Sequence, residues 1–369
     1  MSEDVLKVYI KQLLRCQQAP EVNVAWQGGE PTLMGLDFFK RSVELVKKYR
    51  RPNQQVTYTL QTNGTRLDDE WCAFFKEHAF LIGLSMDGPP EMQNVYRVNK
   101  KGLGSFDQVK RGWDLLQKHN VDTNILCAVH AANASHPLDV YRFFRDHLQA
   151  RFIQFIPIVE RMTPESRLRA EMGRQEFPGG KRPLYMQVGA LVSQRSVESK
   201  QFGNFLIDIF DEWVHQDVGT VFVQMFDSAL ASWYGLPASV CIFQETCGLS
   251  LVLEHNGDLY SCDHFVEPGH RLGNILEIPM IELITSSSQH QFGLDKSNRL
   301  PAICRACDVR FACHGECPRN RFLRTQEGEE GLNYLCEGYR RFFQHVDRPM
   351  RRMVELLRMG RTPAEIMQI

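Results

Sequence analysis

The chain has 369 residues, of which 43% are hydrophobic, so it can bury a sizeable core and is long enough for two or three domains or one large barrel. Its 43 Lys and Arg against 44 Asp and Glu leave a net charge of −1, which does not suggest binding to nucleic acid or an anionic membrane surface. No apolar run reaches the roughly 18 residues that a membrane-spanning helix needs, and the first residues do not resemble a signal peptide. We therefore expect a soluble, cytoplasmic protein.

The first 160 residues alternate between helix-like and strand-like segments. An amphipathic helix with Val5, Tyr9 and Leu13 at helical spacing opens the chain. Further helices are predicted at 37–49, 68–78, 106–119 and 138–147, and strands at 22–26, 56–61, 81–86, 124–129 and 152–158. This alternation predicts an α/β fold with repeated βαβ units and a parallel sheet.

Three distinctive turns follow predicted strands. They read Gln-Gly-Gly-Glu-Pro at 27–31, Gln-Thr-Asn-Gly at 61–64 and Ser-Met-Asp-Gly at 85–88. Ligands of parallel α/β folds bind at the carboxyl ends of strands, so these turns are expected to line one cavity. The two glycines would let the backbone approach a ligand, and the Glu30 carboxylate could accept hydrogen bonds from an ammonium group. Taken alone, Gly-Gly after a strand is usually just a turn.

The pattern changes after residue 160. Residues 161–201 carry many charges, a Gly-Gly and several prolines, which indicates an irregular insertion. Helices are predicted at 202–216 and 221–234, a hairpin at 250–262 around His-Asn-Gly, and a final helix at 335–359. The domains expected from these changes are a partial barrel at 1–160, an insertion and helical linker at 161–235, a cysteine-rich domain at 236–345 and a C-terminal helix and tail at 346–369.

The 11 cysteines are unevenly distributed. Cys16, Cys72 and Cys127 are scattered, whereas eight crowd into the C-terminal part: Cys241, Cys247, Cys262, Cys304, Cys307, Cys313, Cys317 and Cys336. Eight thiolates suit two four-cysteine sites, which could hold zinc or four-iron clusters. Spacing alone favours zinc, and disulfides are not expected in a reducing compartment.

The eight cysteines resemble the SPASM pattern, a cysteine-rich extension of radical S-adenosylmethionine (SAM) enzymes that modify peptides. Gln-Gly-Gly-Glu-Pro-Thr at 27–32, Gln-Thr-Asn-Gly-Thr at 61–65, Leu-Ser-Met-Asp-Gly-Pro at 84–89 and Asn-Tyr-Leu-Cys at 333–336 resemble one branch, the anaerobic sulfatase-maturating enzymes. The resemblance runs from residue 1 to about 345. It implies a partial (β/α) TIM-like radical SAM barrel without its first strand, followed by a SPASM domain. The implied activity is oxidation of a Cys or Ser of a sulfatase to Cα-formylglycine.

The resemblance also implies residue roles. Cys241, Cys247, Cys262 and Cys317 would bind one auxiliary [4Fe-4S] cluster, and Cys304, Cys307, Cys313 and Cys336 the other. Contacts to SAM would come from Gly29, Glu30, Ser85, Arg97 and Ile153. Asp263, next to Cys262, would be the general base that takes the proton of the substrate thiol or hydroxyl. The implied partners are a sulfatase polypeptide and an electron donor such as ferredoxin or flavodoxin.

Simpler interpretations of these residues stay open. Ser85 and Asp87 could only cap their turn, and Arg97 could be a solvated surface arginine. Asp263 could only end a hairpin strand, and the nearby His255 and His264 are expected at the surface or in packing.

The chain contains no Cys-x3-Cys-x2-Cys, the motif that binds the SAM-reducing cluster in this family; Asn320 stands where a third cysteine would follow Cys313 and Cys317. We therefore expect a fragment of a longer enzyme, with a non-catalytic peptide-binding scaffold, a zinc protein, or a modifier of another peptide as alternatives. This polypeptide is expected not to cleave SAM. It is also expected to be less stable than a full-length enzyme, because its sheet would have an unpaired edge.

Overall fold

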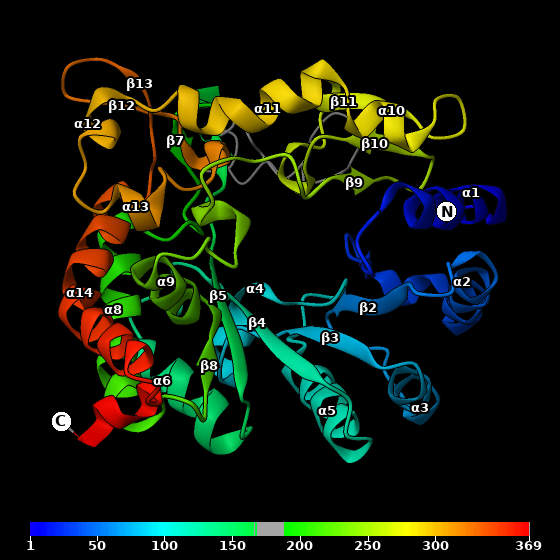
Figure 1. Cartoon of the computed structure of the whole chain (residues 1–369). Helices are drawn as coiled ribbons and strands as arrows, with labels where there is room; N and C mark the ends of the chain where they lie inside the picture. The colour runs from blue at the N-terminus through cyan, green and yellow to red at the C-terminus, as the bar shows by residue number, and fades with distance from the viewer. Residues whose placement is uncertain (166, 168–187, 369) are drawn as a thin grey trace. The chain divides into compact units, whose positions relative to one another are not determined.

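The computed structural model describes residues 1–165, 167 and 188–368 (Figure 1). Its strands are β1 (Glu21–Trp26), β2 (Gln55–Thr62), β3 (Phe80–Ser85), β4 (Thr123–Val129), β5 (Phe152–Pro157), β6 (Arg161–Met162), β7 (Leu191–Val192), β8 (Phe222–Val223), β9 (Val252–Leu253), β10 (Asp258–Tyr260), β11 (Arg271–Asn274), β12 (Leu323–Arg324) and β13 (Glu330–Leu332). Its α-helices are α1 (Glu3–Cys16), α2 (Leu36–Tyr49), α3 (Asp69–Glu77), α4 (Pro90–Tyr96), α5 (Phe106–Lys118), α6 (Pro137–Arg142), α8 (Ser199–Gln216), α9 (Gln224–Tyr234), α10 (Met280–Ile284), α11 (Ser287–Asn298), α12 (Ala302–Arg305), α13 (Arg310–Cys313) and α14 (Cys336–Arg358).

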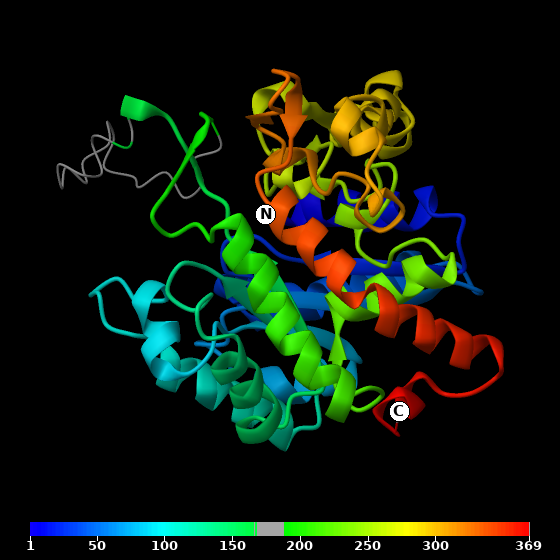
Figure 2. The same cartoon turned by 90° about the vertical axis from the view of Figure 1, so that its left-hand side faces the viewer.

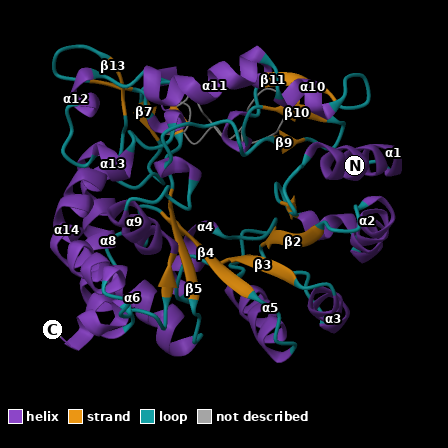
Figure 3. Ribbon diagram, in the orientation of Figure 1, coloured by secondary structure: helices purple, strands orange, loops and turns teal. Residues whose placement is uncertain are grey.

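A six-stranded sheet carries the first part of the chain, in the order β1-β2-β3-β4-β5-β8 (Figure 3). The β1–β2, β2–β3 and β5–β8 pairs are parallel, with Val22 opposite Val56 and Ile153 opposite Val223. Each strand from β1 to β4 is followed by at least one helix before the next strand begins. The α/β fold with a parallel sheet that the sequence predicts is therefore confirmed.

The sequence predicts five strands in this sheet and a helix over 221–234, and both predictions miss β8. Phe222 and Val223 pair with Phe152 and Ile153, and the rings of Phe152 and Phe222 stack with their centroids 5.2 Å apart. The helix α9 begins only at Gln224. A two-residue strand is too short to show an alternating pattern, so periodicity cannot separate it from the helix that follows.

The structure divides into two compact units, and the first comprises residues 1–86, 98–125 and 245–298. In this first unit α1 and α2 bury side chains against the β1–β3 part of the sheet. The opening helix is confirmed, but its most buried residues include Leu6, Ile10 and Leu14, whereas Tyr9 and Leu13 are partly buried. The predicted hairpin is β9 and β10, and β11 extends it to three antiparallel strands.

The second unit comprises residues 87–97, 126–244 and 299–369, as far as they are described. Its helices α8 and α14 lie side by side (Figure 2). A Cβ atom at Gly203 would come within 2.6 Å of Gly338, so this glycine pair permits the close approach of the two helices. The Ser199 hydroxyl accepts a hydrogen bond from the Gly338 backbone N–H at 3.0 Å and thereby holds the start of α14, where Cys336 lies.

The two longest described helices are α8 with 18 residues and α14 with 23. Along α14 the buried face includes Phe342, Val346 and Met350, and the opposite face is polar. In the described ranges, none of the helices is both long enough and apolar enough to cross a membrane.

The segment predicted as an irregular insertion, 161–201, is partly regular. It contains β6 and β7, which pair antiparallel with Arg161 opposite Val192, and α8 begins within it at Ser199. The part of this prediction at 166 and 168–187 lies outside the described residues.

Candidate functional site

The Gln-Gly-Gly-Glu turn directly follows β1 in the first unit. Gly28 and Gly29 have φ angles of +95° and +55°, in the left-handed region that favours glycine. The space that a Cβ atom would fill at either residue has no other atom within 4 Å. The turn therefore needs glycine for its backbone and leaves open space in which a ligand can approach.

Glu30 ties this turn to the one after β2. Its Oε1 accepts hydrogen bonds from the hydroxyls of Thr32 and Thr62, both at 2.7 Å, and its Oε2 accepts one from the Asn63 backbone N–H at 2.8 Å. The two turns are thus joined within one unit, as expected for residues at neighbouring strand ends. Because a carboxylate has about four acceptor positions, Oε2 can still accept a hydrogen from a ligand.

Asp87 and Arg97 form a buried ion pair in the second unit. Asp87 is only 2% exposed, and its two carboxylate oxygens accept from Arg97 Nε at 2.6 Å and Nη2 at 2.9 Å. Although burial acts to raise it, the pKa of Asp87 lies below its usual value because of the Arg97 charge and the hydrogen bonds that the carboxylate accepts. Arg97 is therefore not the solvated surface residue of the simpler interpretation.

The ends of β3 and β4 are connected through Asn133 and His130. Asn133 Nδ2 donates to the backbone oxygens of Asp87 and Ala128, both at 2.9 Å, while its Oδ1 accepts from the His130 N–H at 2.8 Å. His130 Nδ1 accepts from the Ala132 N–H at 3.2 Å, which assigns the ring hydrogen to Nε2. That Nε2 lies 3.6 Å from Asp87 Oδ2. Asp87 thus connects the turn after β3 with the turn after β4, which is more than capping its own turn.

Asp263 contacts the glycine turn. Its Oδ2 accepts a hydrogen bond from Gln27 Nε2 at 3.0 Å, and its Oδ1 accepts one from the Cys262 thiol at 3.1 Å. Asp263 follows β10 and begins a short 3-10 helix, Asp263–Phe265, in the first unit. The predicted base therefore lies between a predicted cluster ligand and the turn predicted to bind SAM.

Four of the predicted cluster ligands line one cavity in the second unit. They are Cys304, Cys307, Cys313 and Cys336, the quartet that the resemblance assigns to one cluster. Residues 301–313 supply three of them through α12, α13 and the turn between, and the fourth begins α14. Burial raises the pKa of Cys313 to about 12 and that of Cys336 to about 11.

These four thiols are the ligand set that a four-iron cluster needs. In a [4Fe-4S] cluster each thiolate binds a different iron, so four cysteines around one cavity suffice. Binding to iron would remove the thiol protons, which burial otherwise favours.

The second quartet is divided between the two units. Cys247 and Cys262 belong to the first, Cys241 and Cys317 to the second. In the first unit, buried Gln289 of α11 donates from Nε2 to the backbone oxygens of Gly248 at 3.0 Å and Ser261 at 3.3 Å. Since Gly248 follows Cys247 and Ser261 precedes Cys262, Gln289 holds together the two segments that carry these cysteines.

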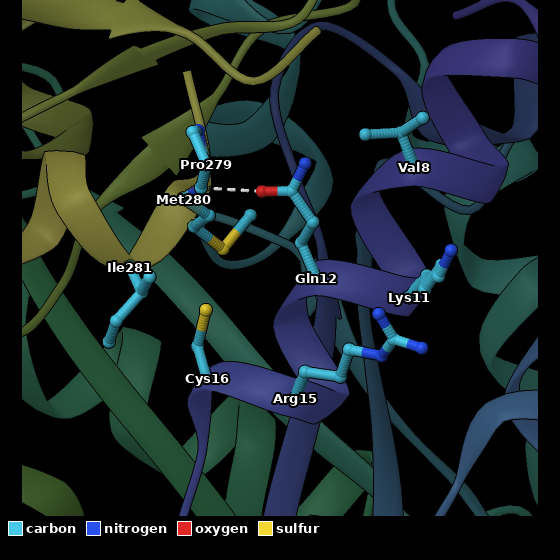
Figure 4. Close-up of a pocket in the computed structure, with 8 residues that line it drawn as sticks. All are labelled: Val8, Lys11, Gln12, Arg15, Cys16, Pro279, Met280 and Ile281. Carbon is cyan, nitrogen blue, oxygen red and sulfur yellow. Dashed lines mark hydrogen bonds between the residues drawn. The ribbon is translucent and has the colours of Figure 1, made fainter.

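Another cleft lies between α1 and α10 in the first unit (Figure 4). Gln12 spans it, because its Oε1 accepts from the Met280 N–H and its Nε2 donates to the Ile275 oxygen at 2.9 Å. Cys16 lines this cleft, and burial raises the pKa of its thiol. None of the predicted site residues lines this cleft.

Two further predicted SAM contacts are buried, but at opposite ends of their strands. Ser85 is the last residue of β3 and is 8% exposed, whereas Ile153 is the second residue of β5 and is 1% exposed. The carboxyl end of β5 is marked by the hydrogen bond from the Ile158 N–H to the Val129 oxygen at 2.8 Å, so Ile153 does not lie at the edge where the other predicted contacts are. His255 is exposed, as expected for a histidine in a hairpin turn. Sequence reasoning missed the supporting residues His130, Asn133 and Gln289, whose roles depend on contacts between distant segments.

Comparisons with known proteins agree with this arrangement. Residues 2–144 match the radical SAM superfamily, and residues 241–308 match the SPASM iron-sulfur cluster-binding domain. The chain is 46% identical over 368 residues to a serine-type anaerobic sulfatase-maturating enzyme of Bacteroides thetaiotaomicron, an alignment that covers 100% of this chain and 86% of the relative. It is 34% identical over 348 residues to a cysteine-type enzyme of Clostridium perfringens, covering 94% and 86%.

Solved structures give the same result. The native maturase anSMEcpe with bound AdoMet matches with a TM-score of 0.82 at 32% identity, over 96% of this chain and 90% of that one. The same enzyme with AdoMet and the Cp18Cys peptide also matches with a TM-score of 0.82, over 97% and 92%. The chain therefore belongs to the family of anaerobic sulfatase-maturating enzymes, radical SAM proteins with a SPASM domain.

Proposed function

We propose that the strand-end turns, Asp263 and the cysteine-lined cavity serve the oxidation of a Cys or Ser side chain of a sulfatase polypeptide to Cα-formylglycine. The observation that carries the proposal is the contact of Asp263 with both Cys262 and Gln27. It brings a carboxylate, a cluster ligand and the glycine turn together in one unit. Family membership and the peptide-bound structure of a relative support the substrate class.

SAM would lie at the strand ends. The open backbone at Gly29 would admit its methionine part, and the remaining acceptor position of Glu30 Oε2 would take a hydrogen from its ammonium group. Ser85 and Arg97 would supply other contacts. The ion pair with Asp87 would hold the Arg97 guanidinium in a fixed orientation.

Asp263 would take the proton. Once reduced by one electron from the cluster on a Cys-x3-Cys-x2-Cys segment, bound SAM would supply a radical able to take a hydrogen atom from the substrate Cβ, and the auxiliary clusters would accept the electron released afterwards. The substrate thiol or hydroxyl must then lose its proton as the thioaldehyde or aldehyde forms. The Cys262 thiol cannot donate once its sulfur binds iron, which leaves Asp263 Oδ1 available for that proton.

The eight cysteines would hold two auxiliary [4Fe-4S] clusters, one on Cys241, Cys247, Cys262 and Cys317, and one on Cys304, Cys307, Cys313 and Cys336. Reduced ferredoxin or flavodoxin would supply electrons. A cytoplasmic location fits these partners, since that compartment keeps thiols reduced.

The test uses the 369 residues joined to a segment with Cys-x3-Cys-x2-Cys from a family relative. This protein is incubated anaerobically with SAM, a reductant and matched sulfatase peptides that carry Cys or Ser. Mass spectrometry should show formylglycine, together with 5′-deoxyadenosine. SAM cleavage without modification of either peptide would show that the substrate is not a sulfatase.

A further inference from the structure

A short loop links the two predicted cluster sites. It runs from Cys313, a ligand of one cluster, to Cys317, a ligand of the other. All three residues between them, His314, Gly315 and Glu316, have left-handed backbones with φ angles of +46°, +74° and +54°. Only glycine adopts this conformation without a steric cost, so the loop is strained at two positions and needs a compensating contact.

The compensating contact is the guanidinium of Arg321. Arg321 Nε donates to the Gly315 oxygen, and Nη2 donates to the oxygens of His314 and Glu316, all at 2.8 Å. The left-handed turn thus directs three successive carbonyls at one cation. The fit is tight, because a Cβ atom at Gly315 would lie 2.8 Å from Arg321 Nη2.

The loop is also a wall of the cluster cavity. Gly315 and Glu316 line it beside the four cysteines. The Glu316 side chain, which is 2% exposed, accepts hydrogen bonds from the amide groups of Asn320 at 3.2 Å and of Asn333. A partly buried cation therefore holds the backbone of the loop that carries Cys313, and a buried carboxylate lines the cavity beside the thiols, where the low dielectric strengthens their fields.

We propose that Arg321 is a positioning and potential-setting residue of the auxiliary cluster on Cys304, Cys307, Cys313 and Cys336. This role rests on the proposed function. The guanidinium holds the Cys313–Cys317 loop, and its charge makes reduction of the cluster easier. Reduction adds an electron to a cluster already surrounded by four thiolates, and a nearby positive charge stabilises the added negative charge. Glu316 acts in the opposite direction.

The test measures cluster iron, acid-labile sulfide and midpoint potential, the last by redox titration followed by electron paramagnetic resonance. The chain is reconstituted anaerobically with iron and sulfide, and the variants are R321Q, R321K and E316Q. The control is R352Q, since Arg352 lies on the surface of α14, is 40% exposed and is paired with Glu355 at 2.8 Å. We expect a lower potential or loss of cluster iron in R321Q, a potential close to wild type in R321K, and a higher potential in E316Q.

Contradicting outcomes are equally definite. If R321Q keeps the iron content and the potential of the wild type, as R352Q should, Arg321 has no such role. If R321Q does not fold, E316Q decides, because an unchanged or lowered potential in E316Q overturns the electrostatic argument. A wild-type chain that takes up no iron would instead refute the proposed cluster site.

Discussion

The Asp87–Arg97 pair allows a prediction whose size follows from the structure. In the variant Arg97→Ala, the Asp87 carboxylate, which is 2% exposed in the wild type, loses both charged hydrogen bonds. It keeps only the Ala128 N–H at 2.9 Å, while His130 Nε2 at 3.6 Å is too far for a good hydrogen bond. Removing one partner of a buried ion pair costs about 3–5 kcal/mol, so we expect a loss of that size in the free energy of unfolding.

The assay is urea-induced unfolding followed by circular dichroism, with Arg352→Ala as the control. Arg352 pairs with Glu355 on the surface of α14, with side chains 40% and 56% exposed, and such pairs contribute about 0–1 kcal/mol. A second readout is pH. The depressed pKa of Asp87 in the wild type means that its contribution is present above the unfolded-state pKa of about 3.9 and is lost as the pH falls.

In Arg97→Ala the pH dependence of the Asp87 contribution to stability should have the opposite sign. Burial without the arginine raises the pKa of Asp87, so protonation relieves the cost and the gap to the wild type should narrow below about pH 5. Removing the second charge as well, in Asp87→Asn with Arg97→Ala, should recover part of the loss. A single-variant loss no larger than that of Arg352→Ala, with no dependence on pH, would refute the buried-pair reasoning.

Other predictions test the remaining parts of the site. Gln27→Ala should slow formylglycine formation roughly tenfold or more, since a hydrogen bond to a charged group contributes about 1.5–3 kcal/mol. Asp263→Asn should slow it about 100-fold or more, since general-base catalysis contributes about 10²–10⁴. A variant that forms formylglycine at the wild-type rate would exclude the role of its residue. Gly29→Ala and Gly35→Ala both place a Cβ at positive φ with open space around it, so both should lose about 1–2 kcal/mol of stability, but only Gly29→Ala should weaken SAM binding in equilibrium dialysis of the extended protein. Burial raises the pKa of Asp227 to about 6, so ionising this carboxyl costs free energy in the folded protein. The free energy of unfolding should therefore fall as the pH rises from about 4 to 6, and Asp227→Asn should melt at a higher temperature than the wild type at pH 8 but not at pH 4.

Local patterns predicted much of this site. The alternation of strands and helices placed the turns at 27–31, 61–64 and 85–88 at strand ends, where the structure has them. The cysteine spacing indicated two four-thiolate sites, and four of those cysteines line one cavity. Family resemblance was needed to choose iron over zinc, because thiolate spacing alone does not distinguish the two.

The missed features depend on distant contacts or on unusual backbone. Nothing near His130 or Asn133 shows that they join the Asp87 turn, which lies more than 40 residues earlier. His314 and Glu316 adopt a conformation that only Gly315 suggests, and Arg321 is one of several arginines in its segment. The strand β8 has two residues and leaves no alternating pattern.

The most direct test of this account is the metal content of the chain after anaerobic reconstitution. We expect a brown protein with about eight iron and eight sulfide per chain, falling to about half in Cys304→Ala or Cys336→Ala and unchanged in Cys16→Ala. A colourless protein that binds zinc and takes up no acid-labile sulfide would contradict it.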